Sequence, residues 1–191
     1  LNGIAFPSDN LDDGYNVLIS RDKLYQDDYT FYGTFQHEIT HAHDMAIIAK
    51  HIGAKNGRCL VESEMYNSSM GVISEFNARR NGYNIVRKII YNFDDRQKEK
   101  KFVLNKEIPF IFDNFKITEK TWYEIAQYLG RIAAIDCIEN AKVEDLFFEL
   151  CENFWDYQTI RKVKNIYDIL YEARNDCYNT INCHDRINRL M

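Results

Sequence analysis

The spacing of apolar residues along the chain predicts a mainly helical protein. Apolar residues recur at intervals of three and four in four segments: residues 60–92, 119–137, 143–157 and 160–175. This spacing gives a helix one apolar face, which packs into a core. We expect one long helix or two in the first segment and one helix in each of the others.

A different pattern indicates a strand near the start of the sequence. Residues 15–20 form a β-prone run between Gly14 and a charged stretch that begins at Arg21. Residues 1–13 contain Pro7 together with several aspartates and asparagines, so we expect turns there. The predicted fold class is therefore α+β, mainly α.

Residues 34–50 form a further predicted helix. This segment contains no proline or glycine, follows Gly33 and ends shortly before Gly53. Thr34 is a possible N-cap, and a glycine just beyond the last turn is a common helix stop. The residues between Leu24 and Gly33 are expected to form a short helix or a loop beside this helix.

The helix of residues 34–50 carries the pattern H-E-x-x-H, in which His37, Glu38 and His41 are the fixed positions. His37 and His41 lie one turn apart on the same helix face, so their imidazoles can share one metal ion. Glu38 lies about 100° round the helix, where it can contact a water on that ion without being a ligand. This arrangement suits a zinc site with an open position. A surface helix that carries the pattern by coincidence is the alternative.

Two histidines do not complete a zinc site, so a third protein ligand is needed. The metzincin continuation is absent, because Asp44 stands at its glycine position and Ile47 at the position of its third histidine. A glutamate from a following helix is the other common solution, and we favour Glu75. Glu62 and Glu64 are competing candidates, but neither is followed by the small residue that would allow close helix packing.

Two charged residues are candidates for orienting these ligands. Arg79 follows Glu75 by one helical turn, the spacing of an intrahelical ion pair, and can hold the carboxylate in a ligating rotamer. Asp44 lies on the same face as His37 and His41 and can accept the second ring N–H of a metal-bound histidine. A solvated charge is the alternative for Asp44.

These motifs carry a resemblance to a known family. H-E-x-x-H followed by E-x-x-A, here Glu75 to Ala78, resembles the gluzincin metallopeptidases, and the short catalytic core resembles the ImmA/IrrE-like members. The resemblance covers about residues 16–88. It implies zinc bound by His37, His41 and Glu75, with Glu38 as general base. It also implies that the strand before the metal-binding helix aligns an extended substrate.

The domain organisation follows from a charge cluster at residues 94–101, which marks the most evident break in the chain and is interpreted as a solvated helix face. Residues 1–93 are predicted to form a minimal zincin-like core: a short strand, the H-E-x-x-H helix and a second helix with the glutamate ligand. Residues 94–191 are predicted to form a helical extension packed on that core as one globular unit.

Composition restricts the partners and the compartment. A formal net charge of −5 argues against nucleic acid as a partner, and no apolar run reaches the length of a membrane span. The five cysteines are scattered without C-x-x-C spacing, which is typical of reduced thiols in a cytoplasmic protein. Cys183-His184 is interpreted as an incidental pair. Because the sequence begins at Leu1, we expect a piece of a longer protein or a processed product, and secretion is the alternative.

The predicted function is that of a zinc-dependent metallopeptidase that hydrolyses peptide bonds in a peptide or protein substrate. The donor that stabilises the oxyanion is unassigned, although a tyrosine can serve this purpose and the chain contains 13. A regulatory or protein-interaction module that retains zinc without meaningful peptidase activity is the alternative. A metal-free helical scaffold is a third possibility.

Overall fold

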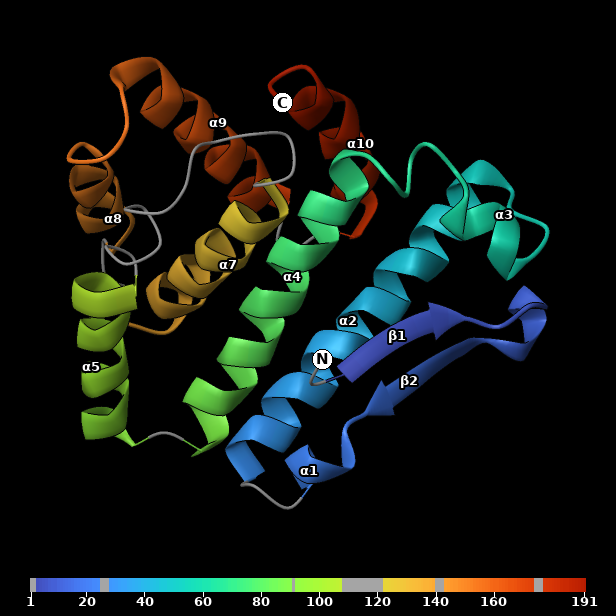
Figure 1. Ribbon diagram of the computed structural model, residues 1–191, viewed down its shortest axis with the longest axis horizontal. Helices are drawn as coiled ribbons and strands as arrows, with labels where there is room; N and C mark the ends of the chain where they lie inside the picture. The colour runs from blue at the N-terminus through green and yellow to red at the C-terminus, as the bar shows by residue number, and fades with distance from the viewer. Residues whose placement is uncertain (1–2, 25–27, 91, 108–121, 140–142, 174–176) are drawn as a thin grey trace.

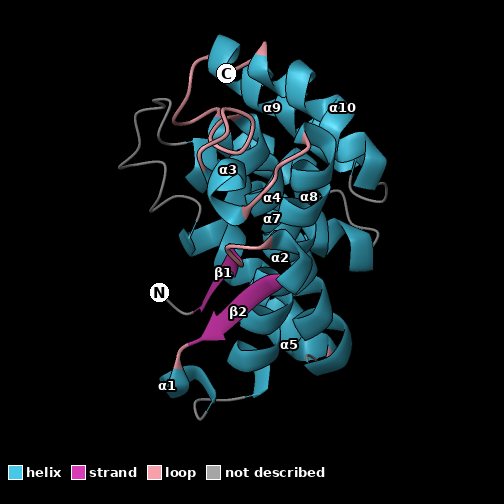
Figure 2. Ribbon diagram, turned by 90° about the vertical axis from the view of Figure 1, so that its right-hand side faces the viewer, coloured by secondary structure: helices cyan, strands magenta, loops and turns pink. Residues whose placement is uncertain are grey.

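The structure is a computed structural model, which describes residues 3–24, 28–90, 92–107, 122–139, 143–173 and 177–191. A two-stranded antiparallel hairpin lies on one side of a set of packed helices (Figures 1 and 2). The fold is therefore α+β and mainly α, as predicted. The strands are β1 (Gly3–Pro7) and β2 (Tyr15–Ile19). The helices are α1 (Arg21–Leu24), α2 (Asp28–Ile52), α3 (Gly57–Val61), α4 (Ser69–Ile85), α5 (Phe93–Phe102), α7 (Trp122–Glu139), α8 (Val143–Cys151), α9 (Tyr157–Ala173) and α10 (Cys177–Asn188).

The hairpin confirms one sequence prediction and corrects another. The strand predicted at residues 15–20 is β2. The turns predicted for residues 1–13 are wrong at Gly3–Pro7, because this segment pairs with β2 in a register that places Gly3 opposite Ile19. Tertiary pairing therefore overrides a weak local preference. Pro7 fits because it stands at the end of the strand.

Helix α2 is longer than predicted at its start. It begins at Asp28, so Thr34 lies inside the helix and is not its N-cap. Gly33 is likewise inside the helix. The predicted end is confirmed, because Gly53 follows Ile52 with a positive φ of 63°.

A close approach between α2 and α4 explains why a glycine lies inside α4 at position 82. A Cβ atom on Gly82 would lie 2.7 Å from the carbonyl oxygen of Gly33 and 3.5 Å from Cβ of His37. Glycine in a helix interior is destabilising relative to alanine. The structure instead uses Gly82 to bring the two helices close to one another.

Helix α4 is also packed tightly on its other side, against α7. A Cβ atom on Gly130 of α7 would lie 2.6 Å from the carbonyl oxygen of Phe76 in α4. Ile73, Phe76 and Leu129 are fully or almost fully buried in one hydrophobic cluster that joins the two predicted parts of the chain. Helix α4 therefore lies between α2 and α7 (Figure 1).

The remaining helices follow the apolar pattern, with shifted boundaries. Residues 60–92 divide into α3, α4 and a π-helical turn at Val86–Ile90. The charged segment of residues 94–101 belongs to α5, which has no buried residue. The helix predicted for residues 143–157 ends at Cys151, because Asp156 accepts the N–H of Thr159 and starts α9. Helix α10 was not predicted, and residues 119–121 of the predicted 119–137 helix lie outside the described residues.

None of the helices in the described part of the chain combines the length and the apolar character that crossing a bilayer requires.

The crossing of α2 and α4 gives a stability prediction. Gly82→Ala is expected to destabilise the protein by about 1–3 kcal/mol, because the added methyl group meets the backbone of Gly33. Gly71→Ala in the same helix is the matched control. Its Cβ would meet only the carbonyl oxygen of Tyr66 at 3.8 Å, so we expect a change of about 0.5–1 kcal/mol in the stabilising direction. Urea denaturation of both variants measures the difference, and equal stabilities would contradict the close contact.

Candidate metal centre

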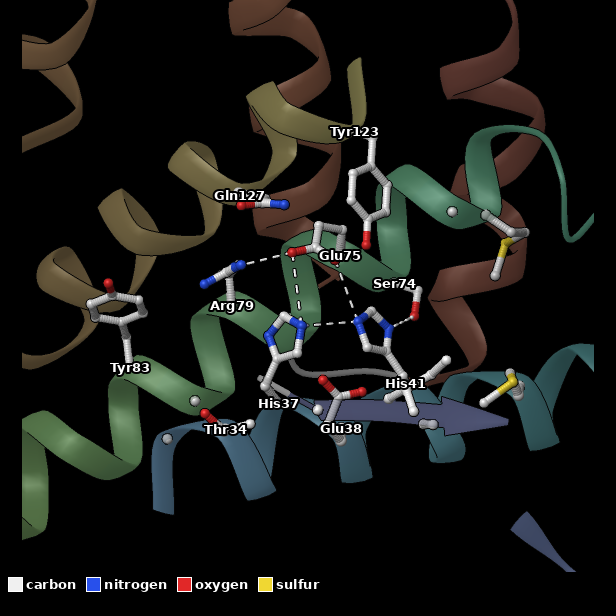
Figure 3. Close-up of a pocket in the computed structure, with 18 of the residues that line it drawn as sticks. Thr34, His37, Glu38, His41, Ser74, Glu75, Arg79, Tyr83, Tyr123 and Gln127 are labelled. Carbon is white, nitrogen blue, oxygen red and sulfur yellow. Dashed lines mark hydrogen bonds and ion pairs between the residues drawn. The ribbon is translucent and has the colours of Figure 1, made fainter. Parts of the chain in front are cut away.

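The histidines of the H-E-x-x-H pattern meet a glutamate from the neighbouring helix. His37 and His41 lie one turn apart on α2, and their Nε2 atoms are 3.0 Å apart. Glu75 approaches from α4, with Oε1 3.8 Å from Nε2 of His37 and Oε2 3.4 Å from Nε2 of His41 (Figure 3). The three side chains selected from the sequence are therefore brought together at one point.

These distances fit a single metal ion. Zinc bonds of about 2.0–2.1 Å in a tetrahedral arrangement place two ligand atoms about 3.3 Å apart. The three separations, 3.0, 3.4 and 3.8 Å, lie around that value. The Glu75 side chain is only 1% exposed, and its Oε2 atom has no hydrogen-bond partner. A buried carboxylate oxygen without a donor is costly unless a cation is bound, and two imidazoles with one carboxylate suit zinc.

Both histidines are oriented by groups on α4. Ser74 Oγ lies 2.8 Å from Nδ1 of His41. The backbone carbonyl of Ala78 accepts a hydrogen bond from the ring of His37. When the outer nitrogen of an imidazole donates its proton in this way, Nε2 presents a lone pair to a cation.

Asp44 does not take the orienting position that was predicted for it. Its Oδ2 atom accepts a hydrogen bond of 3.4 Å from Asn77 of α4, and its Oδ1 atom lies 3.6 Å from Nδ1 of His43. Asp44 is buried and links α2 to α4 one turn beyond His41. Ser74, which was not singled out in the sequence, contacts His41 instead. Its position immediately before Glu75 is the one local signal that could have indicated it.

Arg79 lies where the helical spacing predicts. Its Nε donates to Oε1 of Glu75 at 3.0 Å, which fixes one oxygen of the carboxylate (Figure 3). Burial alone would raise the pKa of Glu75, but His41, His37, Tyr123 and Arg79 outweigh burial and lower that pKa to about 2. Glu75 is therefore ionised at neutral pH, as a metal ligand must be.

The other two motif residues also have shifted pKa values. Burial, with the neighbouring His41 as a second cause, lowers the pKa of His37 to about 4, so its imidazole is neutral at pH 7. Burial raises the pKa of Glu38. A neutral imidazole is the form that binds metals, and a carboxylate with a raised pKa is a stronger base.

Glu38 is held between α2 and the hairpin. Glu38 as a whole is 7% exposed, and its carboxylate accepts a hydrogen bond from the backbone N–H of Ala5 in β1. A Cβ atom on Gly3 would lie 2.8 Å from Cγ of Glu38, so β1 passes directly over this side chain. The strand that borders the site is therefore β1, and the prediction that gave this position to residues 15–20 is wrong. Strand β2 pairs with β1 and does not line the cleft.

A cleft of about 860 Å³ opens over the candidate metal centre. Its walls come from β1, α2, α4 and α7. From α7, the half-exposed Tyr123 points its hydroxyl toward Glu75 (Figure 3). Burial raises the pKa of Tyr123 and the carboxylate of Glu75 raises it further, so this hydroxyl keeps its proton and can donate it in a hydrogen bond. The sequence alone does not indicate Tyr123, because this residue lies far along the chain in the predicted extension.

The other candidates for a metal ligand lie away from the two histidines. Glu62 is exposed and pairs with Arg58 at 2.8 Å, and Glu64 is also exposed. In the Cys183-His184 pair, Cys183 is buried in α10, while His184 lies 2.9 Å from Ser68 Oγ. Among the described residues, these groups do not join the cluster of His37, His41 and Glu75.

Comparison of the chain with protein-family models, with curated proteins and with solved structures finds no match. The geometry and chemistry of the centre are therefore the basis on which we infer a function. The gluzincin resemblance stays a prediction.

The ligand set predicts the metal content. Purified wild-type protein supplied with zinc is expected to hold about one equivalent, and Glu75→Ala is expected to lose most of it, since the site then lacks its third ligand. Glu62→Ala is the control, because it removes an exposed carboxylate that was a competing candidate. Native mass spectrometry gives the stoichiometry. One equivalent of zinc in Glu75→Ala would show that another residue is the third ligand. No bound zinc in the wild type would contradict the proposed metal site.

The contact of Ser74 with His41 predicts a smaller effect on the same site. Ser74→Ala is expected to weaken zinc affinity by about 10–100-fold, because His41 loses the partner that fixes its ring. Asp44→Asn keeps the size of a side chain that does not contact His41, so its zinc affinity is expected to stay near that of the wild type. Competition with a chromogenic chelator measures both affinities. A larger loss in the Asp44 variant would restore the orienting role predicted from the sequence.

Proposed function

We propose that the protein is a zinc-dependent peptidase that hydrolyses peptide bonds in a peptide or protein substrate. The observation that carries the proposal is the convergence of His37, His41 and Glu75 beside Glu38, in a cleft open to solvent. A purely structural zinc site has four protein ligands and no need of a free carboxylate. Three ligands, a neighbouring glutamate and an open cleft are the components of a hydrolytic site.

A zinc ion held by these three side chains supplies Lewis-acid chemistry, because it lowers the pKa of a bound water and polarises a substrate carbonyl. Glu38 accepts the proton of the attacking water and returns it to the amine that leaves. Its burial against β1 strengthens it as a base. The hydroxyl of Tyr123 hydrogen-bonds with Glu75, and a substrate carbonyl oxygen in the cleft offers it an alternative acceptor as negative charge develops there.

The shape of the cleft suits an extended chain. It runs between β1 on one side and α4 and α7 on the other. The family resemblance implied pairing of a substrate with the strand of residues 15–20, but the strand that lines the cleft is β1, so we assign this pairing to β1. Since the N–H of Ala5 is engaged by Glu38, such pairing uses other backbone groups of the strand or displaces this bond.

The same hydrogen bond favours a second candidate function. The N–H of Ala5 lowers the pKa of Glu38, against the effect of burial, and so weakens it as a base. A weakened base suits a protein that keeps its zinc site but binds partners without cleaving them. The two functions differ in one observable: the peptidase releases two products, whereas the interaction module forms a stable complex with an intact partner.

Replacement of Glu38 separates these functions. Glu38→Gln keeps the size of the side chain but removes the base, so we expect unchanged zinc content and melting temperature with a loss of turnover of at least about 100-fold. The assay is digestion of a proteome-derived peptide mixture, with the products read by mass spectrometry. Glu64→Gln, at an exposed position, is the matched control and is expected to cleave like the wild type.

Tyr123→Phe tests the proposed hydrogen-bond donor to the oxyanion. Loss of one donor to the oxyanion is expected to reduce kcat by about 100-fold while zinc stays bound.

Undiminished cleavage in Glu38→Gln would remove this glutamate from the mechanism. A zinc-loaded wild type that cleaves nothing but retains an intact partner would establish the interaction module instead.

A further inference from the structure

The cleft continues past His41 into an uncharged end. Four residues line this end, which we name the methionine subsite: Met45, Tyr66, Met70 and Gly71. Met45 follows His41 by one turn of α2, and Gly71 precedes Glu75 by one turn of α4. The methionine subsite therefore begins directly beside the metal ligands.

The walls of the methionine subsite are apolar. Met45 and Met70 are buried, and the hydroxyl of Tyr66 is directed at the sulfur of Met45, 3.8 Å away. Arg79, which also lines the cleft, lies away from the methionine subsite. Figure 3 shows Arg79 and Ser74 on opposite sides of the ligands, and Met70 is on the Ser74 side because it lies one turn before Ser74 in α4. A charged side chain that entered the methionine subsite would lose its hydration without gaining a partner.

Gly71 keeps the methionine subsite open. All eight glycines of the chain lie in the described residues, and each of the other seven has a positive φ or a neighbour within 3.0 Å of an added Cβ. A Cβ on Gly71 would meet only the carbonyl oxygen of Tyr66, at 3.8 Å. Glycine inside a helix is destabilising relative to alanine, and at this position neither backbone conformation nor packing requires it. The missing side chain at Gly71 leaves empty space in the wall of the cleft.

We propose that the methionine subsite binds a long apolar side chain, such as that of leucine, methionine or phenylalanine, on the substrate residue next to the cleaved bond. This inference rests on the proposed peptidase function and adds its substrate class. Methionine side chains are flexible and polarisable, so they adapt to linear and aromatic groups alike. Burial of such a group against them supplies binding free energy close to the reacting carbonyl.

The test measures binding without catalysis. Leucine hydroxamate and glycine hydroxamate carry the same metal-binding group and differ in one isobutyl side chain. Zinc-loaded wild type is expected to bind leucine hydroxamate roughly 10–100-fold more tightly, as measured by isothermal titration calorimetry. Gly71→Leu fills the methionine subsite and is expected to abolish this preference while its affinity for glycine hydroxamate is kept.

Gly71→Ala controls for the loss of glycine itself. It adds one methyl group and is expected to reduce the preference partly, so the three proteins form an ordered series. Melting temperature and zinc content confirm that each variant is folded and loaded. If Gly71→Leu does not fold, Gly71→Ala still tests the proposal, because its smaller side chain is expected to reduce the preference for leucine hydroxamate in part.

The outcomes separate the methionine subsite from the proposed function. Zinc-loaded wild type that binds both hydroxamates equally, or a loaded Gly71→Leu that keeps the full preference, overturns the methionine subsite and leaves the metal centre intact. A wild type that takes up no zinc overturns both proposals, and the zinc measurement identifies that case. In the peptide-mixture assay, Gly71→Leu is expected to shift cleavage from long apolar residues toward glycine and alanine.

Discussion

The close approach of α2 and α4 is the constraint on which the candidate site depends. The two histidines stand on α2, and the glutamate stands on α4 together with the serine and the carbonyl group that orient the histidine rings. These groups meet because Gly82 allows the backbone of α4 to approach that of α2 at Gly33 within the reach of an ordinary side chain. Metal–ligand distances vary by only about 0.2 Å, so the ligand set depends on the spacing of the two helices.

The carboxylate of Glu75 divides its two oxygens between different partners. Oε1 is held by Arg79, and Oε2 faces His41 without a hydrogen bond. The arginine compensates part of the negative charge in a buried place, which reduces the cost of keeping the carboxylate ionised. It also restricts the rotamer of Glu75, so the carboxylate is oriented toward the histidines before any ion arrives. A site of this kind is organised in advance by side chains that are not themselves ligands.

The parts of the site that the sequence predicts are those set by local geometry. The spacing of His37 and His41 places them on one face of any helix, and the same rule pairs Glu75 with Arg79. The groups that were missed depend on how distant segments pack. Ser74 displaces Asp44 as the partner of His41 because α4, and not the next turn of α2, faces the ring. Strand β1 forms through pairing with β2, and Tyr123 reaches the cleft only because α7 packs against α4.

The packing of α7 on α4 also sets an order of events during synthesis. The proposed ligands and Arg79 belong to the earlier part of the chain, whereas Tyr123 is translated well after them. Because domains emerge from the ribosome with their amino-terminal part first, a nascent chain holds every proposed ligand before one wall of the cleft exists. Translation therefore completes the set of proposed ligands before the residues of the remaining wall of the cleft are synthesised.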